Sequence, residues 1–252
     1  MTEARTALVT GGSRGIGLET ARELAAKGCR VILLARDSDK LKSAREQITL
    51  NGGLVDIFSV NFLEHDATQR VNEFLSENGL KPTILINGLG GGFGSNTMDS
   101  SAKFEEVMRL NFFVAHELTQ LVLENSKRQD WGRFIYFGTL AINHKSASAP
   151  YIAAKAALME YMKTIAKYLG NLSPNILAAA VSPGAISVPG KYLNKIESEN
   201  PDTLAKFFDD NKIPVRRLGT MKEVAEVISF LCDQSSRYLH GCNIQIDGGA
   251  SN

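Results

Sequence analysis

The chain alternates short runs of β-branched and aliphatic residues with longer segments of helical periodicity. Several runs are apolar at every position, which is typical of strands buried on both faces of a parallel sheet. The predicted strands are Thr6–Thr10, Arg30–Ala35, Leu54–Val60, Thr83–Asn87, Arg133–Gly138, Asn175–Val181 and Asn243–Asp247. The predicted helices are Ile16–Lys27, Asp39–Leu50, Ala67–Asn78, Ala102–Lys127, Tyr151–Leu169 and Lys222–Asp233. This alternation predicts βαβ units with right-handed crossovers, and therefore an α/β fold with a doubly wound parallel sheet of about seven strands and helices on both faces.

The organisation of the chain favours a single domain over residues 1–252. A length of 252 residues fits one α/β domain, and no repeat, low-complexity tract or Pro/Gly-rich linker divides the sequence. The longest stretch without a regular pattern is Ser187–Leu218, which contains "KYLNKIESENPDTLAKFFDD". Long insertions in compact domains are usually functional, so we expect a mobile flap here that covers the substrate.

Charge and cysteine content exclude several classes of protein. A net charge of +1 gives no electrostatic reason to expect a nucleic-acid or anionic-membrane partner. No apolar run is long enough to span a bilayer, and the N-terminus does not resemble a signal peptide. Cys29, Cys232 and Cys242 are far apart in sequence, and the four histidines lack metal-ligand spacing, so we expect no disulfide framework and no metal site. A cytoplasmic location follows as the expectation.

The first predicted strand leads directly into "TGGSRGIG" (Thr10–Gly17), and a helix follows. Glycines in this position allow a tight turn, and they let backbone amides approach a pyrophosphate at the positive end of the helix. The pattern alone is weak evidence, and the glycines would also suit a plain turn, but the strand before and the helix after supply the context of a dinucleotide site. The candidate cofactor-binding residues in this loop are Gly11, Ser13, Arg14, Gly15, Ile16 and Gly17.

The end of the second strand bears on the choice of dinucleotide. An acidic residue there binds the ribose 2′-hydroxyl of NAD(H), whereas a cation accommodates the 2′-phosphate of NADP(H). Here the strand ends with Ala35, Arg36 and Asp37, and Arg14 in the glycine loop is a second cation that can approach the same phosphate. This arrangement favours NADP(H) over NAD(H). The alternative is that Arg36 is solvated and that Asp37 binds the ribose.

Tyr151 and Lys155 stand four residues apart in the first turns of a predicted helix rich in alanine. Residues at this spacing share one helix face, so the phenol and the ammonium can act together. A free phenol has a pKa of about 10, and a nearby cation would lower this value toward the range useful for proton exchange. Taken alone, the pair would also suit an interfacial tyrosine beside a solvated lysine.

With these features in place, the sequence resembles the short-chain dehydrogenase/reductase family over essentially its whole length. The segments that carry the resemblance are "TGGSRGIG" at Thr10–Gly17, Asn111 in "MRLNFF", "YIAAK" at Tyr151–Lys155, "SPGAI" at Ser182–Ile186 and "IDGG" at Ile246–Gly249. The resemblance implies a seven-stranded Rossmann-type sheet, a nicotinamide cofactor and a homotetramer (or homodimer) built on helix pairs. It also implies that Tyr151 is the acid/base, that Lys155 supports it and holds the nicotinamide ribose, and that Asn111 holds a water of a proton relay. The other cofactor-binding residues it implies are Asn61, Asn87, Gly88, Pro183, Gly184 and Ile186.

The sequence departs from the family pattern at the position of the catalytic serine, where Thr139 stands. Threonine keeps a hydroxyl for the substrate oxygen, while its methyl group narrows the pocket. Ser146 and Ser148 are rival candidates, but they lie closer to Tyr151 in sequence than the motif requires. We therefore expect Thr139 to be the catalytic hydroxyl.

Three further departures concern the cofactor and the substrate. Where the family usually has Asn-Asn-Ala-Gly, this chain keeps Asn87 but has Gly88 and Leu89 at the next two positions. The glycine-rich segment Gly88–Gly94 is either a substrate contact or only a turn. Asn61 replaces an aspartate that commonly contacts the adenine amine, and its side-chain carbonyl can accept the same hydrogen bond. Val188 replaces a residue that often carries a hydroxyl, so that contact is lost or is transferred to Ser187.

A few other residues have two interpretations each. His144 precedes Tyr151 and either reaches substrate or faces solvent. Phe207–Phe208 either covers an apolar substrate or anchors the flap. The basic stretch "PVRRLG" either faces an acidic carrier protein or is solvated.

The leading hypothesis is an NADP(H)-dependent oxidoreductase that interconverts a carbonyl and a secondary alcohol, with a small-molecule substrate such as a 3-oxoacyl thioester. A sugar, polyol or specialised-metabolite ketone is the alternative substrate. A hypothesis of a different class is a nucleotide-sensing protein that has lost turnover, but the presence of Asn111, Tyr151 and Lys155 together argues against it.

Overall fold

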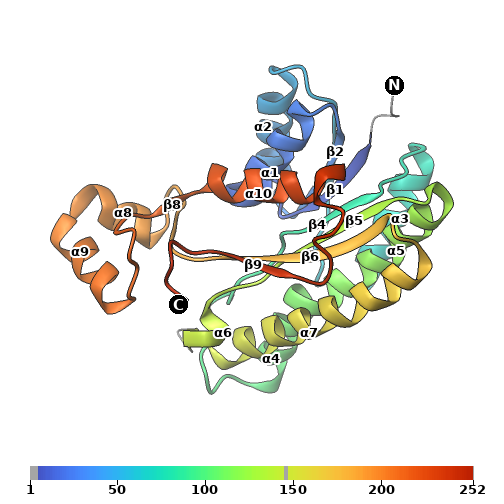
Figure 1. Ribbon diagram of the computed structural model, residues 1–252. Helices are drawn as coiled ribbons and strands as arrows, with labels where there is room; N and C mark the ends of the chain where they lie inside the picture. The colour runs from blue at the N-terminus through green and yellow to red at the C-terminus, as the bar shows by residue number, and fades with distance from the viewer. Residues whose placement is uncertain (1–4, 145–146, 252) are drawn as a thin grey trace.

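A seven-stranded parallel sheet forms the centre of the molecule (Figure 1). The computed structural model describes residues 5–144 and 147–251, apart from the side chains of residues 143 and 144. The strand order is β3-β2-β1-β4-β5-β6-β9, and every neighbouring pair is parallel. The strands are β1 (Thr6–Thr10), β2 (Arg30–Ala35), β3 (Val55–Ser59), β4 (Ile84–Asn87), β5 (Gly132–Phe137), β6 (Ile176–Pro183) and β9 (Asn243–Ile246). The predicted fold class is therefore confirmed.

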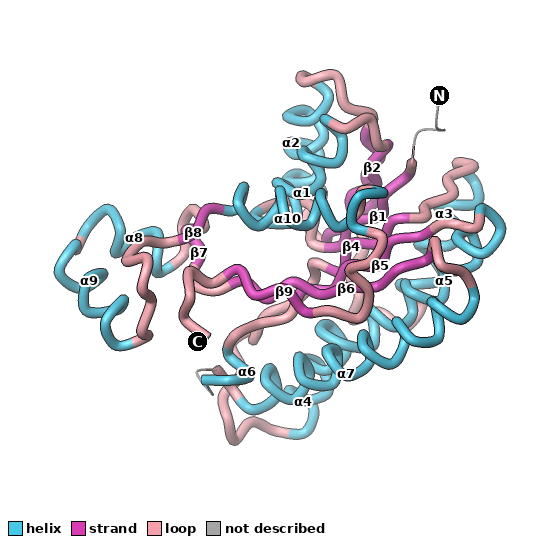
Figure 2. The backbone as a smooth tube through the Cα atoms, in the orientation of Figure 1, coloured by secondary structure: helices cyan, strands magenta, loops and turns pink. Residues whose placement is uncertain are grey.

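Helices cover both faces of this sheet, as the cyan and magenta segments of Figure 2 show. On one face lie α1 (Gly15–Ala26), α2 (Ser38–Thr49) and α10 (Met221–Leu231). On the other face lie α3 (Ala67–Glu77), α5 (Val114–Gln129) and α7 (Ala149–Leu172), with α4 (Ser101–Met108) beside α7. A short helix, α6 (Ala141–His144), precedes α7, and a 3-10 turn at Gln234–Ser236 follows α10.

The strands are buried on both faces, which is why they read as continuous apolar runs. In β1, Leu8 packs in the core under α3, α5 and α7, whereas Ala7 and Val9 pack in the core under α1, α2 and α10. All three side chains are fully buried. Alternation of side chains along a strand thus divides one apolar run between two cores.

The strand order reverses direction between β1 and β4. The chain runs outward from β1 to β2 and β3 and then returns to β4 on the opposite side of β1. In open α/β sheets, ligands bind at this switch point, outside the carboxyl ends of the strands. The loops after β1 and β4 therefore mark the candidate site.

Two predicted segments differ from the structure. The predicted helix Ala102–Lys127 is interrupted by a π-helical turn at Arg109–Phe113, which separates α4 from α5. The segment Ser187–Leu218 is not irregular, because it contains the helices α8 (Tyr192–Glu199) and α9 (Pro201–Asp210).

The helices α8 and α9 extend to one side of the molecule (Figure 1). They are held between β7 (Ile186–Ser187) and β8 (Gly219–Thr220), which form a separate two-stranded parallel sheet. Within the described ranges 5–144 and 147–251, every helix is too short or too polar to cross a membrane.

Candidate active site

The glycine loop after β1 turns sharply away from the sheet. The amides of Gly11 and Gly12 both donate to the carbonyl of Leu34 in β2, at 2.9 and 3.4 Å. Gly11 and Gly15 have φ values of +67° and +62°, a region that favours glycine. A Cβ on Gly17 would lie 2.5 Å from the carbonyl oxygen of Gly11, so α1 packs directly against the loop. The backbone of this loop thus forms an open concave surface, which side chains at the glycine positions would fill.

The start of α1 suits an anionic group. Arg14 precedes the helix in an extended conformation, and its side chain makes no capping hydrogen bond to the first turn. Helix N-terminal amides that lack a cap attract phosphate oxygens. Ser13 lies in the turn before the helix, and Ile16 packs against the core under α1. A dinucleotide diphosphate fits this loop.

The end of β4 adds a second feature that fits a nucleotide. Asn87 is buried, and its side-chain Nδ2 has no hydrogen-bond partner among the described residues. A Cβ on Gly88 would lie 2.7 Å from the carbonyl oxygen of Thr10, so the backbone here leaves no room for a side chain. The hydroxyl of Thr10 accepts a hydrogen bond from the amide of Leu89 at 2.9 Å and so joins the two loops.

The two residues that bear on cofactor choice are used differently. Asp37 accepts a hydrogen bond from the amide of Lys40 at 3.0 Å and forms an ion pair with its ammonium. These contacts cap α2 and hold the pKa of the Asp37 carboxyl below its usual range. Arg36 is exposed, and its backbone carbonyl accepts a hydrogen bond from Ser59. Arg14 is likewise exposed, so both guanidinium groups are accessible to a ligand at this edge.

Tyr151 lies in the first turn of α7, where the positive end of the helix dipole favours an anion. Burial raises the pKa of its phenol, and the hydrogen bond with the Thr139 side chain lowers it in part. The expected lowering of this pKa by Lys155 is not found, and only the Thr139 hydroxyl opposes the effect of burial. The structure nevertheless brings the hydroxyls of Thr139 and Tyr151 together, as the sequence predicted.

Lys155 lies one turn further along α7 and is only 2% exposed. Its Nζ donates to the backbone carbonyl of Phe137 at 2.8 Å, and a Cβ on Gly90 would lie 2.9 Å from the same atom. Burial lowers the pKa of the ammonium to about 8. The solvated-lysine alternative is therefore wrong for this residue.

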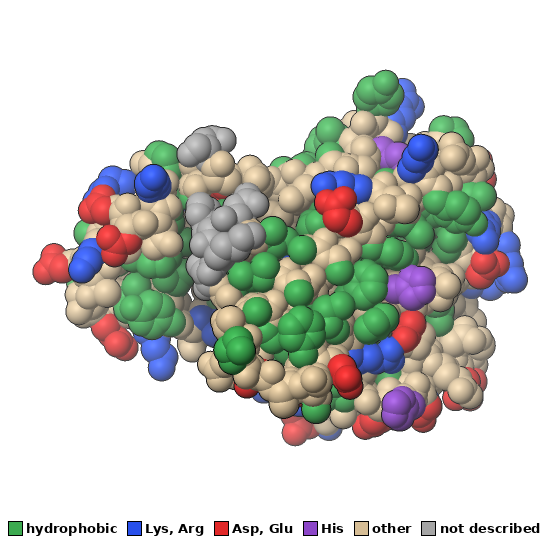
Figure 3. All heavy atoms as spheres, turned by 90° about the horizontal axis from the view of Figure 1, so that it is seen from below, with side chains coloured by type: hydrophobic (Ala, Val, Ile, Leu, Met, Phe, Trp, Pro, Cys, Tyr) green, Lys and Arg blue, Asp and Glu red, His purple; other side chains and the backbone are tan. Residues whose placement is uncertain are grey.

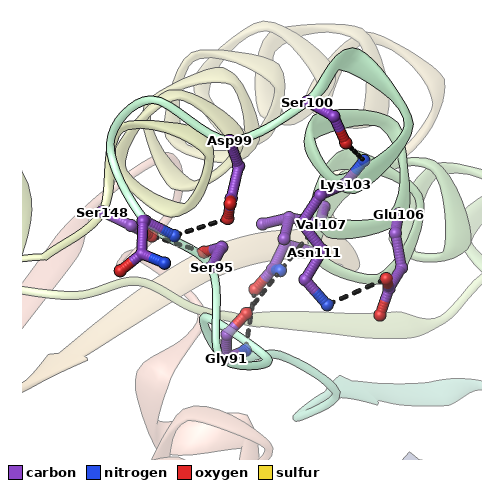
Figure 4. Close-up of polar contacts among 10 residues, drawn as sticks. Gly91, Ser95, Asp99, Ser100, Lys103, Glu106, Val107, Asn111 and Ser148 are labelled. Atoms are coloured by element: carbon purple, nitrogen blue, oxygen red, sulfur yellow. Dashed lines mark hydrogen bonds and ion pairs between the residues drawn. The ribbon is translucent and has the colours of Figure 1, made fainter.

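Asn111 lies in the π-helical turn and holds the loop after β4 (Figure 4). Its Nδ2 donates to the carbonyls of Gly91 at 3.0 Å and Val107 at 2.8 Å, and its Oδ1 accepts from the amide of Gly91 at 3.0 Å. Both amide protons are thus used by the protein. A relay water held by Asn111 would have to bind to an oxygen of this residue.

The remaining predicted cofactor residues lie at the same carboxyl edge. Asn61 follows β3, and its Oδ1 accepts a hydrogen bond from the amide of Leu63 at 3.3 Å, which leaves one lone pair for a ligand. Pro183 ends β6, and a Cβ on Gly184 would lie 2.7 Å from Cα of Asp247. Ile186 begins β7. The "PG" and "IDGG" segments therefore pack tightly against each other.

The residues Ser187 and Val188 bear on the alternative of a lost or transferred hydroxyl contact. The Ser187 hydroxyl donates to Glu197 at 2.5 Å and accepts from Asn194 at 3.2 Å, so it is used to hold α8. Val188 faces the glycine loop, since its Cγ1 lies 3.9 Å from the Cβ position of Gly15. The proton of the Ser187 hydroxyl is therefore used within the protein, at Glu197.

Several other sequence candidates have structural roles. The Ser148 hydroxyl forms a 2.6 Å hydrogen bond with the Ser95 hydroxyl, which favours Thr139 over Ser148 as the catalytic hydroxyl. Phe208 is buried in the cluster under α9, so the anchoring interpretation holds for it. Arg216 pairs with Asp209, and Arg217 pairs with Glu223. Ser146 and the side chain of His144 lie outside the described residues.

Sequence reasoning missed the residues that hold the catalytic groups in place. The backbone of Gly91 bonds to Asn111, and the backbone carbonyl of Phe137 accepts a hydrogen bond from Lys155. Gly90 has no side chain, which leaves room for the ammonium of Lys155. The run of glycines after Asn87 was the available signal, but it did not reveal what the glycines contact. Among the described residues there is no group of three or more side chains that could hold a metal ion.

A family model described as short chain dehydrogenase matches residues 5–197. The chain belongs to the short-chain dehydrogenase family. It is 31% identical to the 3-oxoacyl-[acyl-carrier-protein] reductase MabA of Mycobacterium tuberculosis, over 98% of this chain and 92% of that protein. It is also 31% identical to a tropinone reductase homologue of Arabidopsis thaliana, over 99% and 91% of the two chains.

Among solved structures, the chain is similar to the L-sorbose reductase of Gluconobacter frateurii, which was crystallised with NADPH and L-sorbose. The TM-score is 0.88 at 26% identity, with 98% of this chain and 96% of that chain covered. Membership of this family makes the chain an oxidoreductase of the dehydrogenase/reductase type. The resemblance inferred from the motifs is confirmed.

Proposed function

We propose that this protein is an NADP(H)-dependent oxidoreductase that interconverts a carbonyl and a secondary alcohol, with 3-oxoacyl thioesters as its substrate class. The observation that carries the proposal is the hydrogen bond between the Thr139 and Tyr151 side chains, one helical turn from the buried ammonium of Lys155. Two hydroxyls that face each other can both bind one substrate oxygen. The cation next to them has no carboxylate partner among the described residues.

In the reducing direction, a ketone, NADPH and one proton give a secondary alcohol and NADP⁺. When bound, the nicotinamide would supply the hydride that the carbonyl carbon accepts. Tyr151 binds the carbonyl oxygen and donates its proton to that oxygen as the negative charge develops. Thr139 donates a second hydrogen bond to the same oxygen, and Lys155 stabilises the tyrosinate that remains. In the oxidising direction the same residues remove the proton.

Preference for NADP(H) rests on the division of roles at the end of β2. The Asp37 carboxylate is used to cap α2 and to pair with Lys40, whereas Arg36 and Arg14 are exposed. A 2′-phosphate needs cations, and a 2′-hydroxyl needs a free carboxylate acceptor. The use of NADPH by L-sorbose reductase is consistent with this proposal.

The substrate class rests on the relatives and on the apolar cluster that contains Leu140, the residue after Thr139. Leu140 follows Thr139 and packs with Phe208 and Leu218, while Leu193 and Phe207 lie against the same cluster. An acyl chain suits such surroundings better than a polyhydroxylated sugar does. The 3-oxoacyl-carrier-protein reductases among the relatives favour the same class. A sugar or polyol remains the second candidate because of the likeness to L-sorbose reductase.

We further propose a single domain over residues 1–252, a homotetramer or homodimer and a cytoplasmic location. Hydrophobic side chains gather on the face formed by α4, α5 and α7 (Figure 3). The exposed ones include Phe113, Tyr168 and Leu172. Large exposed apolar patches mark interaction surfaces, and light scattering after gel filtration tests the assembly.

The proposed cytoplasmic location is consistent with the cysteines. Cys29, Cys232 and Cys242 are all free thiols, as expected in a reducing compartment.

The decisive experiment is oxidation of NADPH, and of NADH in parallel, with an acetoacetyl thioester as acceptor. We expect turnover with NADPH by the wild type and none by Tyr151→Phe, with NADPH affinity unchanged. Turnover that survives in Tyr151→Phe would contradict the assigned role of the tyrosine. NADPH binding without turnover of thioesters, sugars or simple ketones would favour the nucleotide-sensing alternative.

A further inference from the structure

The loop after β4 carries one bulky residue in a conformation that suits glycine. Phe93 has a φ value of +51°, and the following Gly94 has a φ value of +74°. The amide of Ser95 donates to the carbonyl of Gly92 at 2.9 Å and closes a four-residue turn around them. Turns with two positive φ values at their centre favour glycine, asparagine and aspartate. A phenylalanine here is a strained choice, and backbone strain of this kind clusters at functional sites.

This turn is held at both ends by the catalytic elements (Figure 4). Before the turn, the amide and carbonyl of Gly91 both bond to the side chain of Asn111 at 3.0 Å. After it, the Ser95 hydroxyl bonds to the hydroxyl of Ser148, which directly precedes α7, at 2.6 Å. The position of the turn is therefore set by Asn111 at one end and by the N-cap residue of the helix that carries Tyr151 at the other.

The ring of Phe93 lies over the backbone next to the buried lysine. Its Cζ atom is 3.9 Å from the Cβ position of Gly91. The neighbouring Gly90 lies against Nζ of Lys155, since its Cβ position is 2.9 Å from that atom. The ring is 39% exposed, so one part contacts the loop and the rest is accessible. An accessible aromatic surface this close to the reacting groups is available to a substrate.

The chemical character of the loop indicates what this surface would contact. Between Gly88 and Ser100 the single charged residue is Asp99, and its carboxylate accepts the amide proton of Asn96. Leu140, the residue after Thr139, belongs to an apolar cluster. Apart from the buried ammonium of Lys155, the loop around Phe93 and the cluster that contains Leu140 therefore offer mainly apolar surface.

We propose that Phe93 is a specificity-determining residue whose ring forms an apolar wall beside the reacting carbon and selects carbonyl substrates with an aromatic or extended apolar substituent on that carbon. This inference rests on the proposed oxidoreductase function and deepens it. Aromatic rings favour contact with other rings and with apolar chains over small or hydroxylated groups. Loss of such a wall changes the preference between substrates without changing the proton-transfer groups.

The test compares two 3-oxo esters that differ only in the substituent on the reacting carbon. Ethyl benzoylacetate carries a phenyl group there, and ethyl acetoacetate carries a methyl group. For each, kcat/KM with NADPH is measured in the wild type, Phe93→Gly and Phe93→Leu. We expect the phenyl-to-methyl ratio of kcat/KM to fall by roughly tenfold or more in Phe93→Gly and by less in Phe93→Leu.

The glycine variant is suited to this test because glycine adopts the φ value of residue 93 without strain. Its melting temperature should equal or exceed that of the wild type. A lower melting temperature with an unchanged substrate ratio would show a purely structural role and overturn the proposal. Met98→Gly is the matched control, since Met98 lies in the same loop, is 92% exposed and should leave the ratio unchanged.

Binding separates this inference from the proposed function. Both esters are titrated by NMR into protein saturated with NADP⁺. Weaker binding of the phenyl ester alone in Phe93→Gly supports the wall, and equal changes for both esters, or none, overturn it. Absence of turnover in the wild type would contradict the proposed function, while the binding comparison would still decide the role of Phe93.

Discussion

The ammonium of Lys155 donates a hydrogen bond to the backbone carbonyl of Phe137, the last residue of β5, at 2.8 Å. This contact joins the catalytic helix α7 to the strand that leads to Thr139. The lysine is almost completely buried, and burial lowers its pKa to about 8. Burial disfavours the charged form, so the ammonium that we propose to stabilise a tyrosinate also weakens the fold when no anion is present.

We expect Lys155→Met to inactivate the enzyme and to stabilise it at pH 7. The pKa of Lys155 is lower in the folded chain than in the unfolded chain, so the unfolded chain binds more protons between about pH 8 and pH 10. The destabilisation of the folded chain by the buried ammonium is fully present below about pH 8 and decreases as the pH rises from about 8 to about 10. The difference in pKa corresponds to a gain of about 3 kcal/mol in unfolding free energy for Lys155→Met. This is an upper value, because in that variant the Phe137 carbonyl loses its hydrogen-bond donor.

Urea unfolding of the wild type and Lys155→Met between pH 6 and pH 10 measures this effect. The gain in stability should shrink toward zero as the pH approaches 10. Lys167→Met is the control, because Lys167 is exposed on the same helix. A variant less stable than the wild type at pH 7 would show that the buried charge is not a net cost.

Thr139→Val should lower kcat/KM by roughly tenfold to a hundredfold, the range for loss of one hydrogen bond to a charged group. The Thr139 hydroxyl lowers the pKa of Tyr151, so its removal should raise that pKa further. The phenol then stays protonated to higher pH, which moves the rise of alcohol oxidation with pH toward more alkaline values. Thr139→Ser keeps the hydroxyl and should keep the wild-type pH profile. An unchanged profile in Thr139→Val would place the catalytic hydroxyl elsewhere.

Gly90→Ala should reduce activity far more than it reduces stability. The added Cβ would lie 2.8 Å from Oδ1 of Asn111 and 2.9 Å from Nζ of Lys155, which forces the end of the lysine side chain to move. Misplacement of a catalytic group by this much lowers rates by a factor on the order of 100. Gly92→Ala, whose added Cβ meets its neighbours at 3.7 Å or more, is the control in the same loop. Steady-state kinetics and thermal melts of both variants decide the point; equal activity would show that the lysine head is free to shift.

Arg36→Ala should weaken NADPH binding by roughly tenfold or more and leave NADH binding unchanged, because a guanidinium–phosphate contact is lost. Arg45→Ala, at an exposed position on α2, should change neither affinity. Fluorescence titration with both nucleotides measures the effect.

Asp37→Ala tests the alternative that Asp37 binds the ribose of NAD(H). If Asp37 only caps α2, the variant should have a lower melting temperature through loss of that cap. Loss of NADH affinity in that variant would instead favour an NAD(H) site.

The agreement between pattern and structure is closest where local rules decide the outcome. Strands β1 and β2 have the predicted bounds, because apolar runs bounded by turn residues leave few alternatives. The helix that contains Asn111 was predicted as one piece and is two. Its π turn coincides with hydrogen bonds to Gly91, which lies twenty residues earlier in the chain. Helical periodicity contains no information on such a contact.

The sequence by itself determined the class of fold, the glycine loop, the family and the identities of the residues proposed to act in catalysis, because each of these depends on local spacing or on a motif. Only the tertiary structure decided how those residues are held. It decided that Lys155 is buried against Gly90, that burial raises the pKa of Tyr151, and that Ser187 is used by α8. Burial and contact between distant segments depend on the packing of the whole chain, and for that reason local sequence could not reveal them.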